Sequence, residues 1–315
     1  MINRNSLLLT GILVTNLTFA GTYPLSDLSK ELASHGFKTG QYGTNILCVS
    51  SNASVICHPN SRLIQVNRRM IWMNAPILTE KDGSFRIASA DLNNVLLPSI
   101  YLTNGKVRQK SRTITVVLDP GHGGQSPGAS SPNKISEKSL VLDIAQMINK
   151  ELLDSGLNVA FSRTMNTNVK NSDRPEKANA LDADMFISIH MNASSNTNSA
   201  GIETYVLPAP DFDSTSGGNG SRDKCPGNDL DADNSRLAYI IHSAVLSETK
   251  ANDRGIRRGR FEVLRTASSP AILIECGFLT NTEEATKLTD MKYRRSIAKG
   301  IANGIGKYAA TLQPK

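Results

Sequence analysis

The sequence has few cysteines, one tryptophan and no long apolar run, and these shortages limit the classes of protein to which it can belong. Four cysteines and one tryptophan occur in 315 residues, and aromatic side chains make up 5%. No apolar run reaches the roughly 18 residues of a membrane-spanning helix, which excludes a polytopic membrane protein. Glycine and proline contents are ordinary, so the chain is neither collagen-like nor disordered throughout. The length fits about two globular domains at roughly 150 residues each.

Charge is distributed unevenly along the chain. Residues 113–315 carry 23 Lys and Arg against 23 Asp and Glu, whereas residues 21–112 carry 11 against 5. The formal net charge of +7 therefore comes almost wholly from the N-terminal third. This predicts either contact of that part with an anionic partner (a wall polymer, a membrane surface or nucleic acid) or a solvated basic face. The neutral C-terminal part argues against a nucleic-acid-binding protein.

The first twenty residues have the pattern of an export signal. Arg4 precedes the apolar stretch 7–14, and Thr18-Phe19-Ala20 places small residues before a cut after Ala20. We expect residues 1–20 to be removed, which leaves no transmembrane segment in the mature chain. The expected location is the periplasm or cell envelope, or the outside of the cell. A buried first strand or helix is the alternative.

Export permits disulfides. Cys48 and Cys57 bracket a short polar run between strand-like residues, so a hairpin disulfide is one interpretation and two free thiols are the other. Cys225 and Cys276 lack the spacing of a metal knuckle. Cys276 follows an apolar strand and is interpreted as a small core residue.

The chain divides into two units. Residues 21–103 predict a small β-rich N-terminal domain for wall targeting or partner binding, with a helical start at Leu25–His35. Residues 104–112 are short, polar and basic, and we interpret them as a linker. Residues 113–315 alternate strand and helix patterns, which predicts an α/β fold with a central twisted, mixed or parallel sheet flanked by helices.

Hydrophobic periodicity locates the elements of the second unit. The expected strands are 113–118, 157–162, 185–189, 201–207, 261–265 and 271–274, and the expected helices are 137–153, 173–181, 234–246 and two segments within 282–312. The glycine-rich stretch 208–233 is interpreted as a flexible loop at the rim of the site, and a regulatory role for it is left open.

Two further features have alternative interpretations. Arg257-Arg258-Gly259-Arg260 is a basic cluster without interleaved aromatic residues, so it is either a solvated turn or a contact for an anionic substrate. Trp72, the single tryptophan, is either part of a small core or a platform for a sugar ring.

Four side chains suited to metal binding or catalysis lie near the ends of predicted elements. His122 follows strand 113–118 in a glycine-rich turn, His190 ends strand 185–189, and Glu275 ends strand 271–274. Glu137 opens the helix after the first loop. Two imidazoles and one carboxylate are the ligand count of a hydrolytic zinc site with an open fourth position, and a further carboxylate nearby could be the general base. The spacing has no H-E-x-x-H helix and by itself leaves buried structural roles open.

Eight ordered segments between about Thr113 and Tyr308 resemble the zinc-dependent N-acetylmuramoyl-L-alanine amidases of the amidase-3 family. They are VVLDPGHGG, SEKSLVLDIA, GLNVAFSR, RPEKANALDADMFISIHMNA, GIETYVL, NSRLAYII, DRGIRRGRFEVLR and PAILIECGFLTN. Their number and order make the match specific. The resemblance covers nearly the whole second unit and implies an α/β catalytic domain.

The resemblance also implies the roles of particular residues. It implies one zinc ion per chain held by His122, Glu137 and His190, with Glu275 as the catalytic carboxylate. The residues Arg174, Asn179 and Asn192 match family positions near the site, where we expect them to support the ligands or the substrate.

The activity that the resemblance implies is cleavage of peptidoglycan. The bond is the amide between the lactyl group of N-acetylmuramic acid and L-alanine, and cleavage serves wall remodelling or daughter-cell separation. A protein activator is a further expectation, and the sequence predicts no oligomeric state. A zinc peptidase or deacetylase acting on wall material is the alternative enzyme, and a wall-binding protein without catalysis is the non-enzymatic alternative.

Overall fold

The computed structural model describes residues 23–103, 113–217 and 221–312. The expected signal 1–20 and linker 104–112 lie outside these residues. None of the helices in the described ranges combines the length and the apolar character needed to cross a membrane.

The C-terminal part alternates strands and helices, as the sequence predicts. Its elements are β9 (Thr115–Pro120), α4 (Glu137–Glu151), β10 (Asn158–Phe161), α5 (Asp173–Ala180), β11 (Met185–Asn192), β12 (Ile202–Val206), a short 3-10 helix (Pro226–Leu230), α6 (Asp231–Thr249), β13 (Asp253–Arg258), α7 (Glu262–Arg265), β14 (Ala271–Phe278), α8 (Thr282–Thr289) and α9 (Met291–Leu312). The strands lie in the order β10-β9-β11-β14-β12-β13, and only the β12–β14 pair is antiparallel. The predicted mixed α/β sheet is confirmed.

The N-terminal part is rich in short strands, as expected. Its elements are β1 (Leu25–Asp27), α1 (Leu28–Ser34), β2 (Lys38–Tyr42), β3 (Asn45–Val49), β4 (Ser54–Cys57), β5 (Leu63–Val66), β6 (Arg69–Trp72), β7 (Leu78–Thr79), β8 (Phe85–Ala88), α2 (Ser89–Asp91), a π-helical turn (Leu92–Leu96) and α3 (Leu97–Ile100). Asn67 and Arg68 both have positive φ and turn the chain between β5 and β6.

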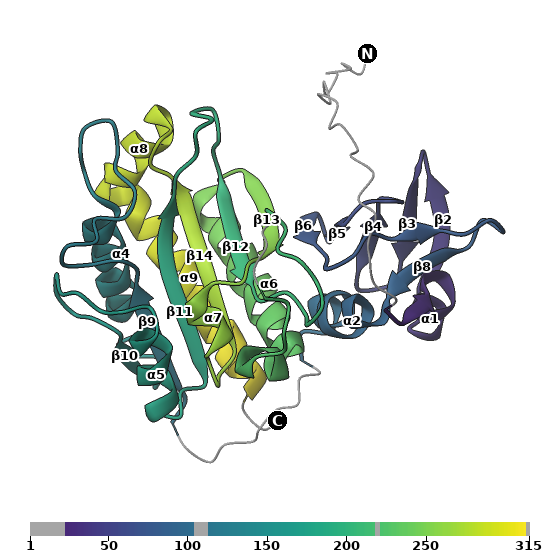
Figure 1. Cartoon of the computed structure of the whole chain (residues 1–315), viewed down its shortest axis with the longest axis horizontal. Helices are drawn as coiled ribbons and strands as arrows, with labels where there is room; N and C mark the ends of the chain where they lie inside the picture. The colour runs from purple at the N-terminus through teal and green to yellow at the C-terminus, as the bar shows by residue number, and fades with distance from the viewer. Residues whose placement is uncertain (1–22, 104–112, 218–220, 313–315) are drawn as a thin grey trace.

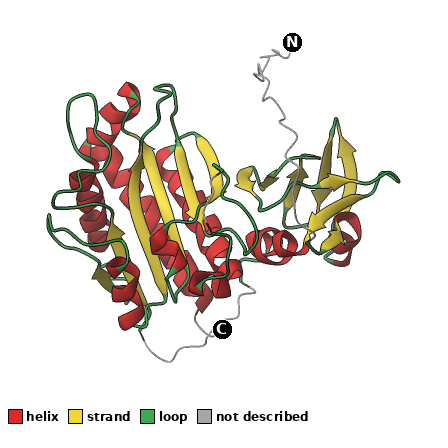
Figure 2. Cartoon of the chain, in the orientation of Figure 1, coloured by secondary structure: helices red, strands yellow, loops and turns green. Residues whose placement is uncertain are grey.

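Helices cover both faces of the C-terminal sheet (Figure 2). Helices α4, α6 and α9 pack on one face, and the shorter α5 and α7 pack on the other (Figure 1). Side chains alternate accordingly along β14: Ile272 and Ile274 join the larger hydrophobic core, whereas Ala271 and Leu273 join the core beneath α5 and α7. Glu275 continues this second series and therefore lies on the α5/α7 face.

The N-terminal strands extend the same sheet. Strand β6 pairs in parallel with β13 at Ile71 and Ile256, and β5, β4, β3 and β2 follow in antiparallel order. One hydrophobic cluster runs from α4 through this junction to Cys48 in β3. The two units are thus joined by a shared sheet and core, in addition to the chain between them (Figure 1).

One expectation about local structure is wrong, and one strand was not predicted. Residues 261–265, expected to be a strand, form helix α7, with Val263 and Leu264 buried against the α5/α7 core. A strand forms instead at Asp253–Arg258, between parallel neighbours β12 and β6. The basic residues of this segment have no apolar alternation, so the tertiary pairing rather than the local pattern decides its conformation.

Candidate metal centre

Three side chains from separate elements meet at the carboxyl ends of β9 and β11. His122 Nε2 lies 3.2 Å from Glu137 Oε2, and His190 Nδ1 lies 2.9 Å from Glu137 Oε1. The two imidazole rings meet edge to face, with centroids 5.0 Å apart. Within the part of the chain that the structure describes, this is the one group of three His, Cys, Asp or Glu side chains close enough to hold a metal ion, with ligand atoms all within 4.8 Å of one another.

His122 is placed by a strained turn after β9. Its φ of 59° lies in the left-handed region, which is costly for a residue with a side chain. Two buried guanidinium groups hold the turn: Arg163 donates to Pro120 O and Gly121 O, and Arg174 donates to Pro120 O and His122 O.

A buried carboxylate in β9 stabilises the turn that places His122. Asp119, fully buried in β9, accepts hydrogen bonds from Arg174 Nη1 at 2.8 Å and from Ser188 Oγ at 2.7 Å. Asp119 and Arg163 are not among the residues that the sequence predicts near the site. The position of Asp119 could have indicated its role, because it lies inside the glycine-rich motif directly after a buried apolar run.

Glu137 is held in its ionised form. Its two oxygens accept hydrogen bonds from the backbone N–H groups of Ala129 and Met191 in addition to facing the two imidazoles. Burial alone would raise the pKa of Glu137, but the bonds to His122 and His190 outweigh it and lower the pKa to about 2. A carboxylate that stays charged while nearly buried is suited to bind a cation.

Glycine is required where the backbone passes these ligands. A Cβ at Gly121 would lie 2.2 Å from the His190 ring, and one at Gly128 would lie 2.3 Å from Glu137 Oε2. Gly121 and Gly128 therefore make room for the candidate ligand side chains.

Glu275 lies beside the three candidate ligands and lines the same cavity. It occupies the position paired with His190 across the parallel strands β11 and β14. Its Oε2 atom is buried without a hydrogen-bond partner. Burial, together with the negative charges of Glu137 and Glu203, raises its pKa well above the usual range. An unpaired carboxyl group in such a place can accept or deliver a proton once a cation lowers its pKa.

All four residues line one open cavity of about 900 Å³. Arg174 and Asn192 also line it, whereas Asn179 does not. The Asn179 side chain instead bridges α5 to the loop after α7, donating to Thr266 O and accepting from Ser268 N. Asn179 is therefore placed to join two elements of the scaffold rather than to touch the candidate ligands.

The interpretation of 208–233 as the rim of the site is not supported by its described residues, 208–217 and 221–233. None of these residues lines the cavity. The stretch packs against the N-terminal part, where Asn74 accepts from Ala209 N and Arg62 donates to Asp213 O and Ser214 O. Tyr23 and Phe212 rings also meet, with centroids 5.0 Å apart.

The basic cluster is not a solvated turn, because Arg257 and Arg258 lie in β13 and Arg258 is buried, while Arg257 and Arg260 are half-buried. None of the three arginines lines the cavity beside the candidate ligands. Arg258 is 2% exposed and donates to Trp72 O, and burial lowers its pKa to about 10. Arg257 stacks on the Trp72 ring, and Arg260 donates to the carbonyls of Ala209 and Phe212. The residues that appeared solvated join the two units.

The cysteines are free thiols. Cys48 pairs with Val55 across the β3–β4 hairpin, and Cys57 pairs with Ile46, so the two cysteines are not directly opposed. Cys276 is completely buried in the larger core, which confirms its interpretation as a core residue.

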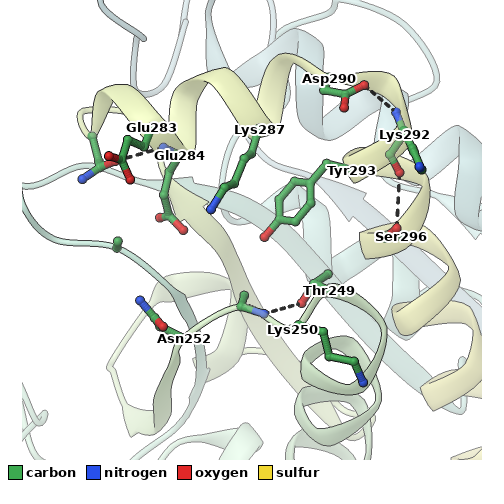
Figure 3. A pocket seen from close by; sticks show the side chains of 13 residues that line it. Thr249, Lys250, Asn252, Glu283, Glu284, Lys287, Asp290, Lys292, Tyr293 and Ser296 are labelled. Carbon is green, nitrogen blue, oxygen red and sulfur yellow. Dashed lines mark hydrogen bonds between the residues drawn. The ribbon is translucent and has the colours of Figure 1, made fainter.

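A second cavity, of about 410 Å³, lies between the end of α6, helix α8 and the start of α9. Figure 3 shows Glu284, Lys287 and Tyr293 directed toward it, with Asn252 on the opposite wall. Most of its charged residues are exposed, and it contains none of the candidate ligands.

The matches to known proteins cover the C-terminal part of the chain. Residues 116–307 match the Amidase_3 family model, described as N-acetylmuramoyl-L-alanine amidase. The chain is 36% identical over 196 residues to the N-acetylmuramoyl-L-alanine amidase CwlM of Bacillus licheniformis, covering 62% of this chain and 68% of that protein.

Solved structures give the same result. An N-acetylmuramoyl-L-alanine amidase from Clostridium difficile 630 is 37% identical, with a TM-score of 0.55 over 64% of this chain and 98% of that one. The CwlD amidase from Clostridioides difficile, solved in complex with the GerS lipoprotein, is 28% identical with a TM-score of 0.53, over 63% of this chain and 99% of its own.

Proposed function

Because the chain belongs to the Amidase_3 family of N-acetylmuramoyl-L-alanine amidases, we propose that it cleaves the amide bond between the lactyl group of N-acetylmuramic acid and L-alanine in peptidoglycan. The observation that carries the proposal is the meeting of His122, Glu137 and His190, with Glu275 beside them in one open cavity.

The three clustered side chains would hold one zinc ion. Two imidazoles and a carboxylate are a donor set that zinc accepts in hydrolytic sites, and the buried, ionised Glu137 supplies the negative charge. When bound, zinc polarises a carbonyl group and makes water more acidic. The hydrogen bonds to Glu137 from Ala129 N and Met191 N keep the carboxylate aimed between the imidazoles.

Glu275 would perform the proton transfers. Its unpaired Oε2 atom faces no competing donor among the described residues, so it is free to take a proton from the attacking water and deliver it to the departing alanine nitrogen. Since water itself would be the nucleophile, the reaction needs no covalent intermediate with the enzyme. The buried Cys276 thiol plays no part in it.

The remaining parts of the chain have proposed roles around this reaction. Residues 1–20 would direct export to the cell envelope, and residues 104–112 would link the N-terminal region 21–103 to the catalytic region 113–315. A protein activator is also proposed, with support from the CwlD amidase, which was solved with the GerS lipoprotein.

Digestion of purified peptidoglycan tests the proposal. The wild-type chain and Glu275→Ala are compared, the products are identified by mass spectrometry, and bound metal is measured on each. We expect sugars with free lactyl groups and intact stem peptides. Glu275→Ala should keep about one zinc ion and lose at least about 100-fold in rate, the usual scale for loss of a general acid–base group. Release of acetate or cleavage within the stem peptide would instead identify a deacetylase or peptidase, and full activity of Glu275→Ala would refute the assigned base.

A further inference from the structure

A second buried carboxylate lies next to Glu275, and it has no role in the reaction described above. Glu203 on β12 pairs with Glu275 on β14, so both side chains leave the same face of the sheet. Glu203 is 3% exposed. Two neighbouring acidic groups repel each other, and a buried carboxylate without compensation is strongly unfavourable.

Three hydrogen-bond donors and the charge of a second arginine compensate Glu203. Its Oε1 atom accepts from Arg254 Nε at 2.9 Å and lies 3.2 Å from Arg257 Nε. Its Oε2 atom accepts from Tyr205 Oη at 2.7 Å and from Asn192 Nδ2 at 2.9 Å. The carboxylate therefore joins two arginines on β13 to an asparagine on β11.

Asn192 brings this network to the cavity. It lines the cavity two residues after His190, and its side-chain oxygen accepts from Ala193 N, so the amide group is fixed at both ends. Asn192 O also accepts from Leu279 N, just beyond β14. Loss of the bond to Glu203 would release this wall of the site beside a candidate ligand.

The other end of the network reaches the N-terminal part. The guanidinium of Arg257 lies over the ring of Trp72 on β6, 5.1 Å from its centroid. The ring covers one side of a charge that would otherwise face water, and the Trp72 backbone carbonyl accepts from the buried Arg258. A cation held on an aromatic face is restrained in position as well as stabilised.

We propose that the N-terminal part helps to position the active site. Trp72 is a positioning residue that acts through Arg257 and Glu203 to hold Asn192 in the cavity wall. The inference rests on the proposed amidase function, and it assigns to residues 21–103 a task in turnover that wall targeting alone would not explain.

The test uses the full chain and sonicated, soluble peptidoglycan strands, because a loss of wall targeting would spare a soluble substrate. Trp72→Ala should lower kcat about threefold to tenfold, the range expected when a coupling contact is removed, with KM and bound zinc unchanged. Trp72→Phe retains a ring face and should recover most of the loss. Glu203→Gln should also lower kcat without removing the metal.

Two comparisons separate positioning from simple destabilisation. Ile71→Ala changes the neighbouring, core-facing residue of the same strand; it should lower the melting temperature but leave kcat unchanged well below that temperature. In a double-mutant cycle, Trp72→Ala should have little further effect on kcat once Arg257→Ala is present, because both remove the same link.

The outcomes distinguish the two proposals. If the wild-type chain releases no stem peptide from these strands while binding zinc, the amidase proposal fails and the inference fails with it. If the wild type is active but kcat is unchanged in Trp72→Ala, or if Ile71→Ala loses as much, only the inference is overturned. Additive losses for Trp72→Ala and Arg257→Ala would likewise overturn the route through Arg257.

Discussion

His190 and Glu275 occupy paired positions on the neighbouring parallel strands β11 and β14. Paired residues leave a sheet on the same face, so strand register alone places the candidate base beside a candidate ligand. A slip of one residue would turn one side chain to the α4/α6/α9 face and separate them. The register of the sheet therefore sets the separation between the candidate metal site and the candidate base.

Removal of a ligand should remove the metal. We expect His190→Ala and Glu137→Gln to bind well under one zinc per chain after dialysis, because the first deletes one of three donors and the second removes the negative charge that attracts the ion. Elemental analysis of the purified proteins measures this. His35→Ala, which changes an exposed histidine of the N-terminal part, is the matched control and should retain the wild-type content. Equal metal contents in all four proteins would contradict the site.

Chelation should stop the reaction reversibly. Dialysis against a strong chelator should abolish peptidoglycan cleavage by the wild type, and zinc added back should restore it, since the three side chains supply no Lewis acid of their own. The measurement is the release of stem peptide before chelation, after it, and after zinc is returned. Undiminished cleavage by metal-free protein would exclude a metal-dependent mechanism.

Gly121→Ala should disturb the site by a steric clash, without removing a candidate ligand or the candidate base. Its Cβ would lie 2.2 Å from the His190 ring, so the ring or the backbone must move. We expect a loss of about 1–3 kcal/mol in the free energy of unfolding, the usual cost of overpacking, together with weaker zinc binding. Gly306→Ala on α9, where a Cβ meets nothing within 4 Å, should be neutral or stabilising. Urea unfolding and zinc titration of both variants provide the comparison.

Arg174→Ala should be strongly destabilising. It leaves the buried Asp119 without its guanidinium and frees the carbonyl of His122, so we expect a loss of about 3–5 kcal/mol in unfolding free energy. The exposed pair of Arg222 and Asp213 is the control, and Arg222→Ala should cost less than about 1 kcal/mol. Chemical denaturation distinguishes the two, and similar losses would show that Arg174 is not the anchor of the turn.

Asp231 should make stability depend on pH. Burial raises its pKa to about 6, so the folded chain keeps a proton that the unfolded chain loses near pH 4. The free energy of unfolding should therefore fall as the pH rises from about 4 to about 6. Asp231→Asn should remove this contribution. The free energy of unfolding of the variant, relative to that of the wild type, should therefore be about 1–3 kcal/mol higher at pH 7 than at pH 4. Unfolding curves of both proteins at the two pH values test it. If variant and wild type differ in unfolding free energy by the same amount at both pH values, the raised pKa of Asp231 is contradicted.

Much of the C-terminal fold was predictable because its strands are continuous apolar runs. Residues 115–118 and 271–274 are buried on both faces, and such strands are recognisable from composition alone. Helix α4 was equally clear, since its apolar residues recur with helical spacing from Glu137 onward. These elements place the candidate ligands near their ends, and the resemblance to the amidase family then implies their role as a metal site.

The junction between the units was not predictable in the same way. Arg257 and Arg258 are typical of an exposed turn, and only the approach of β6 buries one and stacks the other on Trp72. Asn179 was expected near the ligands, but its helix directs it toward residues 266–268. Long-range pairing decides both, and local pattern contains no information about it.

By itself, the sequence determined the alternation of strands and helices, the glycines that a crowded turn requires, and the kinds of side chain available for metal binding and proton transfer. These depend on hydrophobic periodicity and residue chemistry, which act over a few neighbouring positions. Only the tertiary structure decided which strands became neighbours, in what register, and that β6 of the N-terminal part completes the catalytic sheet. Strand pairing joins segments far apart in the chain, and its free energy depends on the surfaces that meet rather than on either segment alone.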